Sequence, residues 1–293
     1  MVGETAPESA GINKLPLTAV SKIPDTWERK ERDGLRLNFT INNRHLITHT
    51  LTSMSDEYFS SMEHREDIVA LQNFAWGQSE RCYNFVAGRL SPAIFFATGS
   101  IDELTQFFDQ VEQSDEFGTI CQQTEAYMQT VREQWERTYP LASQVMQQIT
   151  GLEFNKDMTV MITHPSLSNG QYLGNDTIAW GHHEDWENYS TIYLWHEALH
   201  SYFDFDDTSH ALIQLIADNE LRTRLNPGTT SPPFEGHESL FPLMTRIEPH
   251  WRSYLIDAKK EGKGDIRSFQ VKVQGLHEVK EQSAQHISKS GIE

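Results

Sequence analysis

The segment Thr191–Phe203 constrains this chain more than any other, because its pattern is typical of a helix with two histidines on one side. Four apolar residues recur at spacings of 3, 4 and 3 and form a stripe that predicts a buried face: Ile192, Trp195, Leu199 and Tyr202. His196 and His200 are four residues apart, so both imidazoles project from one side of this helix, next to the stripe.

This spacing indicates metal chemistry. Two imidazole nitrogens on one helix face can bind one zinc ion at about 2.0–2.1 Å each. Glu197 lies one step round the helix from His196, so it can reach a water on the metal without being a ligand. Neutral imidazoles bind, the metal acidifies water and a carboxylate accepts the proton. The run HEALH therefore predicts a hydrolytic zinc (Zn2+) site with His196 and His200 as ligands and Glu197 as general base.

A tetrahedral site with one open position needs a third protein ligand, and the sequence favours Glu220. The intervening residues 201–219 allow the first helix to end and a second helix to return antiparallel to it. Glu220 shares a face of that second helix with Ile213, Ile216 and Ala217. We therefore expect Glu220 to point toward the histidines.

Two other residues compete for the third position. Asp206 stands where the extended HExxHxxGxxH/D pattern of metzincins has its third ligand. That pattern needs glycine for a sharp turn where this chain has Phe203, which argues against Asp206. His210 falls at the start of the second predicted helix, where we expect it to cap the helix or to support a ligand.

The motif HEALH followed by Asn219-Glu220 resembles the gluzincins, which include the thermolysin-like and aminopeptidase-like zinc peptidases. The resemblance covers about residues 155–255. It implies Glu197 as general base and three ligands, His196, His200 and Glu220.

The chain also departs from the thermolysin-like pattern. Those enzymes have an acidic residue four positions after the ligand glutamate, and here that position is Arg224. We therefore expect a zinc histidine to be oriented by Asp218, Asp204 or a backbone carbonyl. The residues after Glu220 are too few for the long C-terminal helical domain of that family, so we expect the helical residues to lie N-terminal instead. We expect a divergent or minimal gluzincin.

The resemblance further implies a downstream histidine or tyrosine that stabilises the tetrahedral intermediate. The candidates are His237, His250 and Tyr254. His237 is preferred because it follows Gly236 in a loop at a predicted helix start, where catalytic side chains are often presented.

Zincins place an edge strand before the active-site helix, where an extended peptide can pair with it. Residues 175–181 (NDTIAWG) have the right place and are similar to the Asn-Ala-x-Trp segment of thermolysin-like enzymes, although their spacing differs from it. The alternative is an ordinary buried strand. His182 and His183 follow it, and adjacent strand residues face opposite ways, so we expect a cleft loop or plain surface there instead of a second metal site.

The predicted fold class is α+β, with an N-terminal helical region, a small mixed sheet and two antiparallel active-site helices. We expect a polar leader (1–34), a strand-like start (35–52) and helical region up to 150, a zincin core (151–258) and a charged tail (259–293). The helical region includes one helix with Leu104, Phe107, Phe108 and Val111 on one face, and a long one broken near Pro140. The core includes strands at 158–163 and 176–181 and helices at 189–203, 209–225 and 238–256.

The composition limits the classes of molecule that this chain is expected to bind. With a hydrophobic content of 38% the chain can bury a sizeable core, and its net charge of −18 disfavours nucleic acid and anionic membranes. No apolar run is long enough to span a membrane. Residues 1–16 do not read as a signal peptide, so cytoplasm is the default compartment and secretion after signal removal stays open. Cys82 and Cys121 are expected to be reduced thiols.

These features together predict zinc-dependent hydrolysis of a peptide bond in a peptide or protein substrate. Two alternatives stay open. The first is a zincin-fold binding or regulatory module that keeps its metal without turnover. The second is a zinc amidase or esterase acting on a small molecule, which a closed, narrow pocket would favour over an open groove.

Overall fold

A computed structural model describes residues 34–53, 63–228 and 235–275 of the chain. The predicted leader, apart from Gly34, and the end of the predicted tail lie outside the described residues. From Gly34 onward the chain forms one compact unit. The unit combines helices with one small mixed sheet, which confirms the predicted α+β class.

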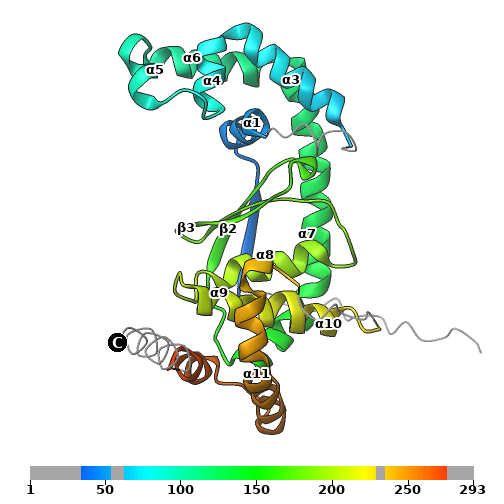
Figure 1. The fold of residues 1–293 in the computed structure, drawn as a ribbon. Coiled ribbons are helices and arrows are strands. Elements are labelled where there is room, and N and C mark those ends of the chain that lie inside the picture. The colour runs from blue at the N-terminus through cyan, green and yellow to red at the C-terminus, as the bar shows by residue number, and fades with distance from the viewer. Residues whose placement is uncertain (1–33, 54–62, 229–234, 276–293) are drawn as a thin grey trace, which may run out of the picture. The chain divides into compact units, whose positions relative to one another are not determined.

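The sheet has four strands in the order β1-β2-β4-β3 (Figure 1). β1 pairs parallel with β2, and β2 pairs parallel with β4, whereas β3 pairs antiparallel with β4. Their bounds are β1 (Arg36–Thr40), β2 (Asp157–Ile162), β3 (Asn169–Gly174) and β4 (Thr177–Gly181). In β2 every second residue is buried, so one face of this strand packs on the core.

The structure corrects the predicted edge strand. β4, which we expected at the edge, lies between β2 and β3, and β3 is the edge strand. The pair Gly174-Asn175 predicts a turn, and the turn lies at Asn175 and Asp176, with φ of 49° and 52°. The pair Asn169-Gly170 also resembles a turn in the sequence but belongs to β3. Gly170 is needed in the strand, because a Cβ there would lie 2.9 Å from the ring of Trp180 opposite it.

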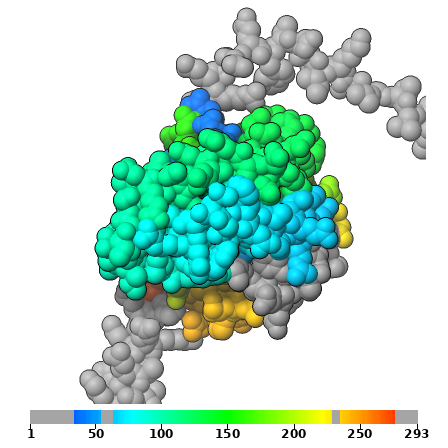
Figure 2. Space-filling model, turned by 90° about the horizontal axis from the view of Figure 1, so that it is seen from above, coloured from blue at the N-terminus to red at the C-terminus, as the bar shows by residue number. Residues whose placement is uncertain are grey.

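The N-terminal helices have a hydrophobic core of their own, built around residues such as Leu46, Leu71 and Phe107. Figure 2 shows several of these helices covering one face of the molecule. They are α1 (Asn43–Thr52), α3 (Arg65–Gln78), α4 (Glu80–Val86), α5 (Pro92–Thr98) and α6 (Ile101–Glu112). Helix α6 confirms the helix predicted there, and Phe107 and Val111 are its buried residues.

The strand-like interpretation of residues 35–52 is right only for β1. Residues 43–52 form α1, whose N-cap is Asn42, since its side chain accepts a hydrogen bond of 3.0 Å from the His45 N–H. Leu46, Ile47 and Leu51 are buried at helical spacing. This packing outweighs the β-branched residues that suggested a strand.

Helix α7 (Asp115–Thr150) connects the two cores. Its first turns contribute Phe117 and Ile120 to the N-terminal core, and its later turns contribute Trp135 and Met146 to the larger core around the sheet. The predicted break near Pro140 is absent, because the helix continues through this proline to Gly151. Burial along both halves stabilises the helix despite the lost backbone hydrogen bond.

Two antiparallel helical segments carry the candidate site, as the sequence predicted. The first is α8 (Tyr189–Leu199), and the second is a run of α9 (Asp207–Gln214), the π-helix η2 (Leu215–Leu221) and α10 (Arg222–Leu225) (Figure 1). Helix α8 is buried on nearly every side, so its polar side chains face protein and not bulk water.

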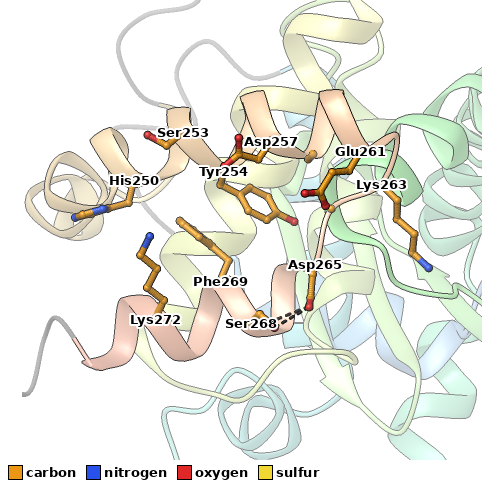
Figure 3. Close-up of a pocket in the computed structure, with 12 residues that line it drawn as sticks. His250, Ser253, Tyr254, Asp257, Glu261, Lys263, Asp265, Ser268, Phe269 and Lys272 are labelled. Atoms are coloured by element: carbon orange, nitrogen blue, oxygen red, sulfur yellow. Dashed lines mark hydrogen bonds between the residues drawn. The ribbon is translucent and has the colours of Figure 1, made fainter.

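The C-terminal part comprises η3 (Glu238–Leu240), α11 (Phe241–Glu261) and a helix over residues 266–275. The start of the predicted charged tail is therefore packed, with Ile266, Phe269 and Val273 in the larger core. A cavity of about 270 Å³ lies between α11 and the last helix, beside the rings of Tyr254 and Phe269 (Figure 3). None of the helices in the described ranges has the length and apolar character needed to cross a membrane.

Candidate metal centre

Three histidines come together at the ends of the antiparallel helices. His196 and His200 come from the end of α8, and His210 comes from the first turn of α9. One ring nitrogen from each lies within 4.8 Å of the others, and the ring centroids are 5.0–5.4 Å apart. Among the described residues this is the one set of histidine, cysteine, aspartate or glutamate side chains close enough to share an ion.

The donor atoms suit a metal such as zinc. The Nε2 atom of His210 is buried and makes no hydrogen bond within the described part of the chain. An unpaired buried polar atom is costly, and a metal bond would satisfy it. Three imidazoles leave one tetrahedral position open, as a hydrolytic zinc site requires.

Electrostatics keep two of these imidazoles neutral. Burial, together with the smaller effects of the neighbouring His196, His210 and His237, lowers the pKa of His200 to about 3. Burial also lowers the pKa of His210 to about 4, with His196 and His237 adding to the effect. Both rings are therefore unprotonated at neutral pH, which is the form that binds a metal.

His196 is held by a buried carboxylate from η2. Its Nδ1 lies 2.9 Å and 3.1 Å from the two oxygens of Asp218, and both side chains are almost fully buried. Burial alone would lower the pKa of His196, but the charge of Asp218 and this hydrogen bond raise it above its usual value. Asp218 is thus the orienting residue among the three candidates named above, and it leaves Nε2 of His196 available to a metal.

Glu197 lies beside this group and next to the edge strand. Its side chain is buried, and burial raises the pKa of the carboxyl, while His196 and a hydrogen bond from the backbone N–H of Tyr172 lower it. Tyr172 belongs to β3. The predicted base is therefore placed between the histidines and the free edge of the sheet.

The structure does not bring Glu220 into the histidine group. Its carboxylate lies 3.2 Å from the guanidinium of Arg224, which also donates to Gln148 on α7. In the π-helix η2 each turn holds more residues than an α-helical turn, which shifts the residues that face α8. Asp218 then faces His196. His210, which comes before η2 on α9, is the third side chain of the group.

Asp206, the metzincin-like alternative, also lies outside the group. Its carboxylate caps α9, accepting from the Ser209 N–H at 2.9 Å and from the Ser209 hydroxyl at 2.7 Å. Asp204 is exposed. A histidine ten residues after His200, on the first turn of the returning helix, was the sequence signal for His210. The sequence alone predicts a capping or supporting role for this residue.

His237 lies at the margin of the group. Its ring is exposed and makes an edge contact with His210, with the centroids 4.9 Å apart. The preceding Gly236 has φ of 114°, and a Cβ there would lie 2.5 Å from the side chain of Gln214, so only glycine allows this approach. Asn219 ties the same loop to η2 by accepting from the Glu235 N–H at 3.2 Å.

The other candidates lie elsewhere. His250 and Tyr254 line the C-terminal cavity (Figure 3), where the Tyr254 hydroxyl donates to the carbonyl of Ile149 at 2.5 Å. His182 stacks on Tyr189 at 4.7 Å, and its Nδ1 lies 2.8 Å from the carbonyl of His183. His182 and Tyr189 thus belong to a cluster of aromatic side chains that includes Trp180 and Trp186.

Comparisons with protein-family models, with curated proteins and with solved structures give no match. The interpretation of the site therefore depends on the chain's own residues.

Proposed function

We propose that this protein is a zinc-dependent hydrolase that cleaves peptide bonds, with His196, His200 and His210 as ligands and Glu197 as general base. The observation that carries the proposal is the convergence of three imidazoles beside a buried carboxylate. The HExxH core of the gluzincin resemblance is kept, whereas the third ligand is a histidine from the returning helix.

Each residue of the site has a distinct task. Asp218 fixes the ring of His196 from the Nδ1 side, and the low pKa values of His200 and His210 keep their rings neutral. When bound, zinc would acidify a water and polarise the substrate carbonyl.

Glu197 handles the proton. Its carboxylate accepts the proton of the attacking water and passes it to the leaving amine. Burial raises the pKa of this carboxyl, which brings it closer to neutral pH and makes both accepting and returning the proton easier.

The edge strand favours a peptide over a small amide. Within the described residues β3 pairs only with β4, so its other edge offers backbone groups to an extended chain. The backbone N–H of Tyr172 on β3 is close enough to Glu197 to lower the pKa of its carboxyl, which puts this strand next to the proposed base. A peptide lying along β3 would thus pass the histidines.

Metal content and turnover test the proposal. Protein purified without chelators should hold about one zinc per chain by elemental analysis. It should cleave a mixed peptide pool, lose this activity on chelation and regain it with zinc. Glu197→Gln should keep its zinc but lose nearly all hydrolysis, because an amide cannot accept the proton. Glu136→Gln, at an exposed position of α7, is the matched control and should behave as wild type.

The outcomes separate the alternatives. Wild-type protein without bound metal would overturn the proposal. A zinc-loaded protein that cleaves no peptide would favour the binding or regulatory module. Loss of zinc in Glu197→Gln would make Glu197 a ligand instead of the base.

A further inference from the structure

Phe205 is the most exposed of the large hydrophobic side chains in the described ranges, with 79% of its surface accessible. It lies in the turn between α8 and α9, where two of the three histidines are only five residues away on either side. A single exposed apolar side chain is ordinary on a protein surface, so the side chains that Phe205 contacts decide whether it has a role.

The ring of Phe205 lies beside two other rings. Its plane is 6° from that of His200 and 21° from that of Tyr172, and each centroid separation is 6.1 Å. Tyr172 and His200 are 16° from parallel at 6.3 Å. Phe205, Tyr172 and His200 therefore form an aromatic shelf. Within this shelf, His200 is a candidate metal ligand and Tyr172 lies on the edge strand.

We infer that this shelf is a specificity subsite that receives an aromatic or large aliphatic side chain next to the cleaved bond of the substrate. The inference rests on the proposed function, which it extends by naming a substrate class. A peptide that pairs with β3 passes Tyr172, and a carbonyl placed at the histidines lies beside His200. The side chain adjoining that carbonyl then meets Phe205, which offers an apolar face and no hydrogen-bonding group.

The position of the cut bonds gives the first test. Wild-type zinc-loaded protein is incubated with a peptide library, and the products are mapped by mass spectrometry. We expect phenylalanine, tyrosine, leucine or methionine to be enriched on one side of the cleaved bond. Enrichment of charged or small residues at both flanking positions would overturn the inference.

Substitution of Phe205 gives the second test. Two peptides that differ only at the preferred position, phenylalanine or glycine, are compared by kcat/KM. In Phe205→Ala the ratio of the two values should fall about tenfold, since one apolar contact in a pocket is worth about 10–200-fold in discrimination. Phe96→Ala is the matched control, an exposed phenylalanine of α5 outside the site, and its ratio should equal that of wild type.

A binding measurement separates this inference from the proposed function. In the Glu197→Gln background the same labelled peptides are titrated by fluorescence anisotropy, and Phe205→Ala should weaken binding of the phenylalanine peptide about tenfold more than that of the glycine peptide. Wild type that cleaves peptides, with an unchanged ratio in Phe205→Ala, would overturn the subsite alone. Zinc-loaded wild type that neither cleaves nor discriminates between the peptides would overturn both proposals.

Discussion

The Nδ1 atom of His196 on α8 lies 2.9 Å from a carboxylate oxygen of Asp218 on η2, and both side chains are buried. A carboxylate in this position decides which ring nitrogen carries the proton and how the ring is oriented. The pair also links the two antiparallel segments, so the geometry of the candidate site depends on the π-helical turn.

Asp218→Ala should weaken zinc binding without abolishing it. Losing a carboxylate that orients a metal-binding histidine typically costs about 10–100-fold in affinity. The dissociation constant is measured by competition with a chromogenic chelator. Asp204→Ala removes an exposed aspartate and serves as control. Equal zinc affinities in the two variants would show that Asp218 does not support the metal.

The identity of the third ligand is tested by His210→Ala and Glu220→Ala. His210 shares the space between His196 and His200, whereas the carboxylate of Glu220 contacts Arg224. His210→Ala should therefore lose zinc affinity by more than about 100-fold, because two ligands remain, and Glu220→Ala should change it little. The same chelator competition decides between them. If Glu220→Ala lost zinc affinity and His210→Ala kept it, the ligand set implied by the gluzincin resemblance would be supported instead.

A third prediction concerns the dependence of folding stability on pH. Burial lowers the pKa of His164 to about 4, and the nearby His64 and His183 add to this effect while Asp67 opposes it. Both ring nitrogens of His164 are engaged in the neutral form. Nδ1 accepts from the Ser166 N–H at 3.3 Å, and Nε2 lies 3.1 Å from the amide oxygen of Gln123.

The direction in which stability changes with pH follows from proton binding. Between about pH 6.5 and pH 4 the unfolded chain binds a proton at this position and the folded chain does not, so stability falls as the pH falls. His164→Asn should reduce the loss of unfolding free energy between pH 7 and pH 5 by about 1–2 kcal/mol, measured by urea denaturation. The pKa of His49 is also lowered to about 4, so part of the slope should remain. A variant with the wild-type slope would contradict the role of His164.

Much of the fold was predictable because local patterns and tertiary packing agree. The stripe on α6 and the helix pair around HEALH follow from apolar spacing alone. The errors occur where long-range packing decides. β3 is polar and glycine-containing, and it becomes a strand because Gly170 fits against Trp180 on β4. Pro140 stays helical because α7 buries side chains on both sides of it, such as Trp135 and Met146.

The candidate site was predictable to the extent that its residues share one helix. His196, Glu197 and His200 follow from spacing within α8. The direction in which Glu220 points depends on how the second segment is wound, and a π-helical turn leaves no clear pattern in a single sequence. A regular helix predicts Glu220 on the face toward the histidines, and the place of His210 at the start of that helix predicts a capping or supporting role. The same winding makes Asp218 the partner of His196.

The last prediction concerns His237, the residue we expected to stabilise the tetrahedral intermediate. Its exposed ring contacts His210 and is carried by a loop that is fixed by Gly236 and Asn219. It is close to the histidine group but not one of the three that gather there. This position suits a donor to the developing oxyanion better than a ligand.

His237→Ala should therefore keep its zinc and its substrate affinity but lower kcat by about 10²–10³-fold, the usual effect of removing one oxyanion donor. The measurement combines zinc analysis with kcat and KM on one peptide. His250→Ala, which removes a histidine that lines the C-terminal cavity and is not part of the histidine group, is the control. Loss of zinc in His237→Ala would make His237 a fourth ligand. A rise in KM with kcat unchanged would mean that His237 only binds substrate, because an interaction made solely in the transition state lowers kcat.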